Sequence, residues 1–420
     1  MTTQQIFNHT YGNGLTLVAQ SMPWLESAAF SIAVPAGCRF DPENKIGIAN
    51  FTCEMVQRGC GKYNSREFIE ALESLGVDYS SSASLYTTNF GGAMQWAQLH
   101  DALAIYSDVL QRPTFSDDQL EDGRMVCFQE IAALQDDLAQ RTLRQLRLKH
   151  YGLTDGRNCE GTIESVQSIT LDDLQAFYQK CYRPNGLVIA CAGKLDWESL
   201  KAHVGGLFDG WQSKSDPEMI VQPAEHGIHH IEHESEQTHI AVGYPGVHYA
   251  HKDYYLNQGA IGVLSGGMSS RLFTEVREKR GLCYTVFATG STLRDKGAVL
   301  CYSGTSNDRA QETLDVILDE LRKLAQGITE DELRRLKVQI RSGLIMQQES
   351  CRGRAGSIAG DWLHSGRVKT LDEINKAING LTVESINQYL ASNPPRDFDV
   401  VTLGPQPLEF KEDGVSAAPA

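Results

Sequence analysis

Short apolar runs and amphipathic stretches alternate along the whole chain, and this pattern predicts strands mixed with helices. Runs rich in β-branched residues and bounded by glycine or proline are typical of strands, whereas apolar positions three and four apart are typical of helices. In the first half the pattern predicts strands at residues 15–19, 28–35 and 187–192, two further strands within 77–96, and helices at 46–59, 98–112, 117–147 and 171–181. Ser116 is expected to cap the helix at 117–147, because its hydroxyl can accept a hydrogen bond from a first-turn N–H group.

The second half of the chain repeats this order of elements. The pattern there predicts strands at residues 229–234, 238–244, 283–290, 297–304 and 398–403, and helices at 253–265, 270–279 and beyond 308. Short matches accompany the repeat: Ile-Ala-Val at residues 32–34 recurs at 240–242, and Ser-Arg at 65–66 recurs at 270–271. Because these and further matches keep one order at nearly one offset, we infer two tandem copies of a domain of about 200 residues.

This order of elements predicts an α+β fold. We expect two tandem homologous α/β sandwich domains, each with helices packed on a mainly antiparallel sheet. The first domain is expected over residues 1–209 and the second over residues 229–420. The segment 210–228 between them is rich in serine and proline, so it is expected to be a linker.

Composition and charge exclude several classes of protein. Of the 420 residues, 41% are hydrophobic and 22% are charged, which is typical of a globular protein and not of a disordered chain. The 38 basic and 53 acidic residues give a net charge of −15, so nucleic acid is not an expected partner. No apolar run reaches ~18 residues, and the N-terminus lacks the basic and apolar regions of a signal peptide. We therefore expect no membrane association and a cytoplasmic location.

The ten cysteines lie singly and never as C-x-x-C. In a chain of this length such spacing does not predict a disulfide framework. We expect most of them to be small buried hydrophobic residues in a reducing compartment.

A group of histidines near the predicted linker contains a string that fits a zinc motif. His229, Glu232 and His233 match H-x-x-E-H, which on a helix places two ligands ~6 Å apart. The pattern here predicts a strand, on which residues four apart are separated by ~13 Å and cannot share one ion. We therefore expect a solvated strand and linker edge, with no shared metal, at His226, His229, His230, His233 and His239.

A second stretch, residues 47–55 with a glycine-bearing turn after it, resembles the active-site helix of the pitrilysin family. That family includes insulin-degrading enzyme and the mitochondrial processing peptidases. Its pattern is H-x-x-E-H, with a glutamate ligand 76 residues after the second histidine. In this chain Asn50 stands at the first histidine and Cys53 at the catalytic glutamate. Glu54 stands at the second histidine, and Glu130 lies 76 residues beyond it. The resemblance covers the whole chain, because the family's subunits are tandem α+β repeats of this size.

The departures from the family pattern remove the chemistry of zinc hydrolysis. That reaction needs imidazole or carboxylate ligands and a base that takes a proton from zinc-bound water. Asn50 offers only an amide oxygen, and Cys53 cannot replace the carboxylate base. Glu54 and Glu130 could still hold a hard cation, but the resemblance implies no catalytic zinc here. We expect Asn50, Glu54 and Glu130 to hydrogen-bond between two helices, and we expect no cofactor in this chain.

A third stretch, residues 266–284, closely resembles the signature of the family's second domain. In catalytic members that domain supplies an arginine and a tyrosine seven residues apart, which hold the substrate backbone and stabilise the oxyanion at the zinc. Arg277 and Tyr284 occupy these two positions. A permanently charged guanidinium and a phenolic donor are suited to binding carbonyl oxygen.

The resemblance implies a zinc-less subunit of a heterodimeric zinc metallopeptidase, inactive alone. Its partner would be a homologous catalytic subunit with intact H-x-x-E-H and bound zinc, although a homodimer is also open. Arg277 and Tyr284 would act in trans on unfolded peptides held partly by strand addition.

Two alternatives belong to other classes of function. One is a scaffold role like that of the core subunits of the respiratory bc1 complex. The presence of Arg277 and Tyr284 argues against this role, because a scaffold has no evident need for the pair. The other is an autonomous metallohydrolase with an unusual site in the histidine group, which the predicted strand disfavours.

Overall fold

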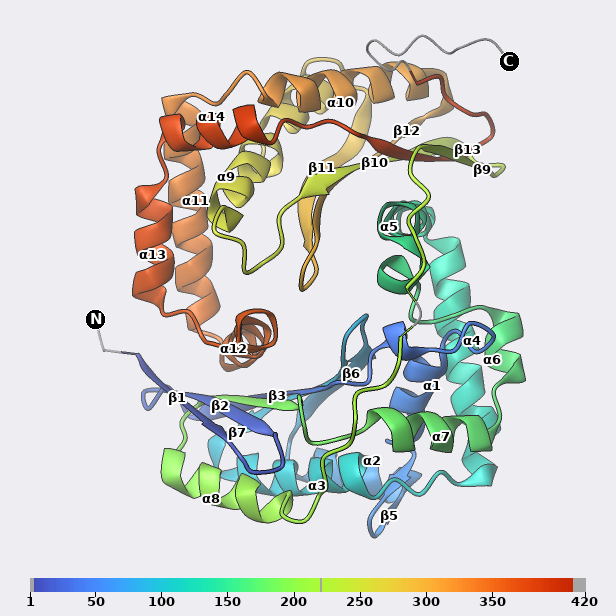
Figure 1. The fold of residues 1–420 in the computed structure, drawn as a ribbon, viewed down its shortest axis with the longest axis vertical. Coiled ribbons are helices and arrows are strands. Elements are labelled where there is room, and N and C mark those ends of the chain that lie inside the picture. The colour runs from blue at the N-terminus through green and yellow to red at the C-terminus, as the bar shows by residue number, and fades with distance from the viewer. Residues whose placement is uncertain (1–3, 220, 411–420) are drawn as a thin grey trace. The chain divides into compact units, whose positions relative to one another are not determined.

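The structure is a computed structural model that describes residues 4–219 and 221–410. The chain forms two compact units, and each unit is assembled from three segments. The first unit comprises Met1–Asp136, Arg157–Gln222 and Arg341–Asn375. The second comprises Asp137–Gly156, Pro223–Ile340 and Lys376–Ala420. Each unit is a mainly antiparallel sheet covered by helices (Figure 1), which confirms the expected tandem α/β sandwiches.

The first unit is built on six strands in the order β1-β2-β8-β3-β7-β6. Strands β2 and β8 pair in parallel, and the other neighbours are antiparallel. The strands are β1 (Gln5–Thr10), β2 (Thr16–Ser21), β3 (Ser27–Val34), β6 (Asp78–Ala83), β7 (Thr88–Gln95) and β8 (Val188–Gly193), and a short hairpin pairs β4 (Gly59–Cys60) with β5 (Tyr63–Asn64). Strand β6 lies at an edge of the six-stranded sheet, and its first five residues are exposed.

Helices cover both faces of this sheet, because successive strand residues point to opposite sides. Leu17 and Phe30 face the larger core of the unit. Helices that contribute to this core are α1 (Ile48–Met55), α2 (Ser65–Ser74), α3 (Leu99–Gln111), α4 (Leu120–Asp136), α6 (Ile163–Ser168), α7 (Leu171–Cys181) and α8 (Trp197–Leu207). On the other face, Val18 and Val188 pack against Ile358 of α12 (Cys351–Ser365).

The second unit repeats this plan on five strands in the order β11-β12-β10-β13-β9. The strands are β9 (Ile228–Glu232), β10 (Gln237–Gly246), β11 (Cys283–Thr292), β12 (Gly297–Ser306) and β13 (Asp399–Gly404). One face packs against helices α9 (Tyr254–Ser265), α10 (Ala310–Leu324), α11 (Glu330–Gln348) and α14 (Val383–Ser392). On the other face, Leu146 of α5 (Leu138–Gly156) packs against Ala241 and Val401. Helices α11 and α13 (Leu371–Gly380) have residues in both units.

The composition of the units differs from the domain boundaries expected at residues 209 and 229. Helix α5 comes from the first half of the sequence but belongs to the second unit. Helix α12 comes from the second half but covers the first unit's sheet. Periodicity shows that a helix has an apolar face, but not which sheet that face will cover. Each unit therefore takes one of its helices from the other half of the sequence.

The helix expected at 117–147 is two helices, α4 and α5, and Ser116 does not cap it as predicted. A 3₁₀ turn, Asp117–Gln119, comes first, and the Ser116 hydroxyl makes no capping bond to it. That hydroxyl donates instead to the side chain of Asp118. A short polar side chain often bonds locally in this way, in competition with the cap.

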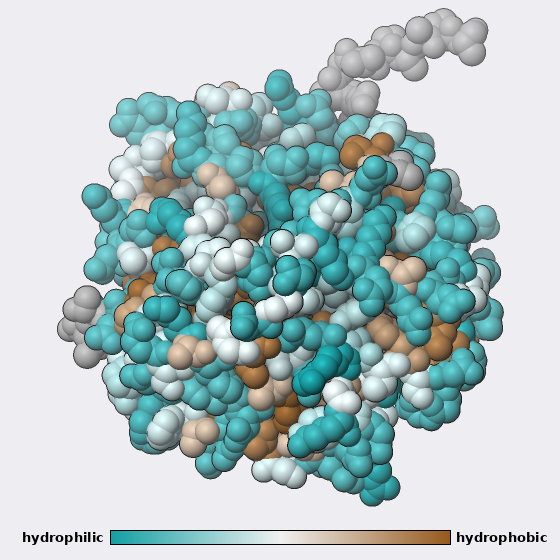
Figure 2. All heavy atoms as spheres, turned by 60° about the horizontal axis from the view of Figure 1, so that its bottom comes forward, coloured by the Kyte–Doolittle hydropathy of each residue, from teal (hydrophilic) through white to brown (hydrophobic). Residues whose placement is uncertain are grey.

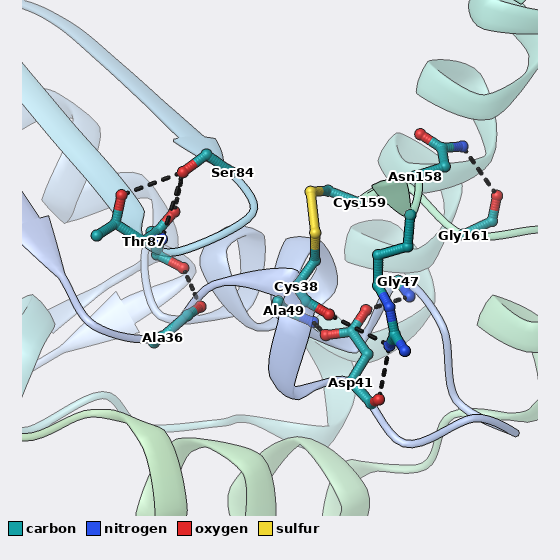
Figure 3. Close-up of a disulfide and its surroundings, with 12 residues drawn as sticks. Ala36, Cys38, Asp41, Gly47, Ala49, Ser84, Thr87, Asn158, Cys159 and Gly161 are labelled. Atoms are coloured by element: carbon teal, nitrogen blue, oxygen red, sulfur yellow. Dashed lines mark hydrogen bonds between the residues drawn. A yellow bond between two sulfur atoms is a disulfide. The ribbon is translucent and has the colours of Figure 1, made fainter. Parts of the chain in front are cut away.

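One pair of cysteines departs from the reduced state that we expected. Cys38 and Cys159 form a disulfide between segments 121 residues apart in sequence (Figure 3). The other eight cysteines are free, and all but Cys283 are buried, as expected for small apolar residues. A disulfide is typical of oxidising compartments, so this bond gives the predicted cytoplasmic location no support.

Hydrophilic residues cover most of the face shown in Figure 2, and hydrophobic residues appear there as scattered patches. Among the described residues, no helix combines the length and apolar character needed to cross a membrane.

Candidate functional site

Helix α1, which carries three of the four predicted zinc-motif positions, is fixed at its N-terminus by Asp41. The buried Asp41 carboxylate accepts hydrogen bonds from the backbone N–H groups of Gly47, at 2.8 Å, and Ala49, at 3.3 Å (Figure 3). Gly47 has φ of 99°, and an added Cβ would lie 2.7 Å from the Glu160 carbonyl oxygen, so only glycine suits this turn. Burial raises the pKa of Asp41 to about 8, against the opposing effects of these hydrogen bonds and of Arg157.

Asn50 of α1 and Glu130 of α4 lie in direct contact. The Asn50 Nδ2 atom donates a hydrogen bond to Glu130 Oε2 at 2.7 Å. Because a carboxylate oxygen is an acceptor, it is the amide nitrogen of Asn50, and not its oxygen, that faces Glu130. Although Glu130 is exposed as a residue, desolvation of its carboxyl group raises its pKa above the usual value; the bond from Asn50 opposes the rise and the nearby Glu54 adds to it.

Glu54 and Cys53 do not join this pair. Glu54 Oε1 is held by Arg58 Nε at 2.7 Å, one turn along from Glu54. Cys53 is 3% exposed, and burial raises the pKa of its thiol to about 12, so it is a neutral thiol near pH 7. Of the four sequence-predicted positions, Asn50 and Glu130 bond each other, whereas Glu54, although near Glu130, bonds Arg58.

This donor set does not fit the zinc of a hydrolase. Zinc in such sites takes three imidazole or carboxylate ligands, with a base beside the bound water. Here one position presents an amide N–H, one carboxylate is paired with an arginine, and the base is replaced by a buried thiol. Helix α1 therefore lacks both the ligands and the base that zinc hydrolysis needs.

Edge strand β6 lies next to α1. Gln57, just beyond the end of α1, donates through Nε2 to Ser81 Oγ of β6 at 2.9 Å. The same Nε2 donates to the Cys53 carbonyl oxygen at 2.8 Å. The exposed edge of the first unit's sheet is thus anchored beside the degenerate zinc positions.

In the second unit, Arg277 and Tyr284 are in contact with each other. Arg277 lies in a π-helical turn, Phe273–Glu278, and Tyr284 is the second residue of β11. The guanidinium carbon lies 4.4 Å from the centroid of the Tyr284 ring and 4.8 Å from that of Phe273. A guanidinium over aromatic faces is held by cation–π attraction while its N–H groups stay available.

The position of Tyr284 follows from an irregularity in β11. Cys283 pairs with Thr305 and Thr285 pairs with the adjacent Gly304, so Tyr284 is the extra residue of a β-bulge. A bulge redirects its side chain away from the regular alternation. Tyr284 is 80% exposed and borders a hollow of about 420 Å³ that is also lined by Arg309. Strand β11 is an edge of the second unit's sheet.

The histidines around the H-x-x-E-H string do not converge on one another. His229 and His230 lie on strand β9, where their ring nitrogens contact the Glu225 carbonyl oxygen and the Thr402 hydroxyl respectively. His239 is not at a solvated edge as expected: it is buried on β10 and contacts the Tyr302 hydroxyl. The strand expected in place of a zinc helix is present.

Sequence reasoning missed another convergence in the second unit. His150, His226 and Asp399 place one ligand-type atom each within 4.8 Å of one another. They come from α5, from the segment before β9 and from the start of β13. Separations of 76 and 173 residues leave no local motif, so no pattern in the sequence could have grouped them.

Comparison with known proteins identifies the family. The description "Insulinase (Peptidase family M16)" matches residues 16–158, and "Peptidase M16 inactive domain" matches residues 168–340. Together these matches span well over half of the chain. The chain belongs to peptidase family M16. This confirms the resemblance to pitrilysin-type subunits that the sequence indicated.

Relatives of this M16 chain match it over almost its whole length. The uncharacterized zinc protease YmxG of Bacillus subtilis is 27% identical over 405 residues, covering 95% of this chain and 98% of that protein. The peptidase M16 inactive domain from Pseudomonas fluorescens has a TM-score of 0.88 at 22% identity, covering 97% of this chain and 99% of that one. A chain of complex III₂ from Candida albicans has a TM-score of 0.81 at 18% identity, covering 95% and 96%. These structural similarities establish the shared fold.

Proposed function

We propose that this M16 chain is the zinc-less subunit of a two-subunit peptidase. Its partner is a homologous chain with an intact H-x-x-E-H and bound zinc. This chain supplies Arg277 and Tyr284 to the partner's substrate. The observation that supports the proposal most is the contrast between the two units: the zinc positions are occupied by the Asn50–Glu130 hydrogen bond, whereas Tyr284 is 80% exposed.

The arrangement of Arg277 and Tyr284 suits a carbonyl oxygen that gains negative charge. Stacking on Phe273 and Tyr284 orients the guanidinium, and the bulge turns the phenol outward. Donors that are already oriented stabilise a developing oxyanion without reorganisation at the moment of reaction. Arg277 and Tyr284 hold and polarise the substrate, and zinc bound to the partner would supply the attacking water.

Exposed sheet edges support the choice of an extended peptide as substrate. Strand β11 begins beside Tyr284 and is an edge strand, and β6 is an exposed edge in the other unit. An extended peptide binds such an edge through backbone hydrogen bonds, which read chain conformation more than sequence. Unfolded segments fit this mode, whereas folded proteins do not present a free strand.

The test is reconstitution with a homologous subunit that carries H-x-x-E-H. We expect the lone chain to leave a quenched fluorescent peptide intact and the pair to hydrolyse it. Arg277→Ala and Tyr284→Phe in this chain should each lower kcat/KM of the pair by about 10²-fold or more, as loss of an oxyanion donor does. Arg280→Ala is the matched control, because this exposed arginine lies two residues beyond the same helical turn and bonds Glu275 at 2.8 Å.

Three outcomes would contradict the proposal. Hydrolysis by the lone chain would make it an autonomous enzyme. An active pair that is unaffected by Arg277→Ala would remove the role in trans. A stable complex with no hydrolysis would favour the scaffold function, for which the similarity of fold to a complex III₂ chain is the supporting observation.

A further inference from the structure

Two histidine side chains of the second unit converge on one carboxylate oxygen. His150 Nδ1 lies 2.6 Å from Asp399 Oδ2, and His226 Nδ1 lies 3.0 Å from the same atom. The two imidazole rings stand nearly perpendicular, at 85°, with their centroids 5.8 Å apart. Two ring nitrogens and a carboxylate oxygen thus face a common point.

The surroundings hold this group in place and leave one side open to solvent. The side chain of Asp399 is 1% exposed, and its other oxygen accepts a hydrogen bond from the Gly227 N–H at 2.7 Å. The side chain of His150 is 7% exposed, whereas that of His226 is 65% exposed. A second hydrogen bond that orients a ligating carboxylate is a common feature of metal sites. An ion could reach the group from the His226 side.

The donor set and its spacing are those of a zinc-type ion. Two imidazoles and one carboxylate, with water in the fourth position, are an established ligand set for zinc in proteins. Tetrahedral bonds of ~2.0–2.1 Å place neighbouring ligand atoms ~3.3 Å apart. The His226–Asp399 pair, now at 3.0 Å, would have to lengthen by ~0.3 Å, which the exposed His226 can provide. The His150–Asp399 pair, now at 2.6 Å between two buried side chains, would have to lengthen by ~0.7 Å.

We propose that His150, His226 and Asp399 form a binding site for a divalent ion of the zinc type. The ion takes the place of the two imidazole–carboxylate hydrogen bonds, and a water molecule completes its shell. The site is separate from the zinc positions of the M16 family, which are Asn50, Glu54 and Glu130 in the first unit.

The role of this site is to stabilise the second unit by linking three of its segments. His150 lies on α5, the helix that the second unit takes from the first half of the sequence, and Asp399 begins β13, which lies between β10 and β9. A bound ion would join α5, the segment before β9 and β13 at one point. Binding to the folded state alone stabilises a protein by mass action.

The experiment measures metal binding by the full chain after removal of metal with EDTA. We expect about one zinc ion per chain in calorimetric titration, a d–d absorption spectrum with Co²⁺, and a higher Tm with either ion. His226→Ala should weaken zinc binding by at least ~10-fold, because loss of a ligand costs at least as much as loss of an outer contact. It is the primary variant, because His226 is exposed and its removal leaves the core intact.

His229→Ala is the matched control, since it removes a histidine three residues away whose ring nitrogen contacts the Glu225 carbonyl oxygen and which lies outside the proposed ligand group. It should bind zinc like the parent chain. Asp399→Asn should also abolish binding, with folding checked by circular dichroism. No zinc binding by the parent chain, or equal binding by the parent and His226→Ala, would overturn the proposal. If Glu54→Gln abolished zinc binding, the bound zinc would belong to the first unit and not to the proposed site.

Discussion

The Asn50 amide donates a hydrogen bond to Glu130 Oε2 at 2.7 Å, so two of the four predicted zinc-motif positions touch through an atom that cannot ligate. The contact places these positions of α1 and α4 side by side, so their side chains decide whether a metal can bind.

Restoring the imidazoles should restore zinc binding there. Asn50→His with Glu54→His, made in a His226→Ala background, should bind about one zinc ion per chain together with Glu130. The control, Asn50→His with Glu54→Gln in the same background, has one imidazole fewer and should bind far more weakly. Zinc content after gel filtration is the measurement. No gain by the double variant would show that the helices are not placed for a metal.

Arg277 and Tyr284 should contribute little to stability. Because Tyr284 is 80% exposed, Tyr284→Ala should change the free energy of unfolding by no more than about 0.5 kcal/mol, and Arg277→Ala should change it similarly. Tyr244→Ala in the same unit is the contrast: Tyr244 is 5% exposed, and its truncation should cost about 3 kcal/mol or more. Urea unfolding measures all three. A large loss for Tyr284→Ala would mean that the pair is kept for folding.

Asp41 should make stability fall as pH rises. Burial raises the pKa of Asp41 from 3.8 to about 8, so the folded chain keeps a proton that the unfolded chain releases. The stabilising contribution is complete below about pH 3.8 and is lost as the pH rises through about 8. Asp41→Asn keeps an oxygen acceptor for Gly47 and cannot ionise, so its stability should depend less on pH over this window.

The measurement is the urea midpoint of wild type and variant at several pH values between these limits. Asp209→Asn, at an exposed position, should follow the wild-type curve. Parallel curves for wild type and Asp41→Asn would show that Asp41 is ionised throughout, held by its two backbone donors.

The Cys38–Cys159 disulfide should stabilise the turn before α1. Cys38 lies three residues before Asp41, and Arg157, two residues before Cys159, donates a hydrogen bond to the Asp41 carbonyl oxygen at 2.7 Å. The disulfide and the Asp41 side chain that holds the N-terminus of α1 therefore stabilise the same loop. Replacing both cysteines by alanine should lower the free energy of unfolding by about 2–5 kcal/mol in non-reducing buffer. Cys283→Ala, at a free cysteine, should have a smaller effect. Non-reducing peptide mapping checks the pairing directly, and a free Cys159 thiol in that map would contradict it.

Local pattern was enough for most of the elements. The apolar run expected at residues 187–192 is β8 (Val188–Gly193), and the helix expected at 171–181 is α7 (Leu171–Cys181). The H-x-x-E-H string was correctly placed on a strand, because alternation toward β10 outweighed the motif. These predictions succeed because strand and helix periodicity is a local property of the chain.

The packing of helices on sheets and the geometry of the candidate sites depend on residues that are distant in sequence. Nothing near Leu146 indicates that its helix will cover Ala241, and nothing near His150 points to Asp399, 249 residues away. The bulge that turns Tyr284 outward depends on its pairing with β12, which spacing within β11 does not reveal. Position in the family pattern identified Arg277 and Tyr284, whereas their mutual stacking appeared only in the structure.

The exchange of α5 and α12 has a consequence for synthesis on the ribosome. The sheet of the first unit is complete once β8 has been made, but the face that carries Val18 and Val188 packs against α12, at residues 351–365. That apolar face therefore stays exposed while some 160 further residues are translated, and intermediates with exposed apolar surface are prone to aggregate. Helix α5 waits in the same way for β10 and β13. Cutting the gene between its two repeats should therefore yield two fragments that each lack a cover, and neither should fold to a native unit without the other.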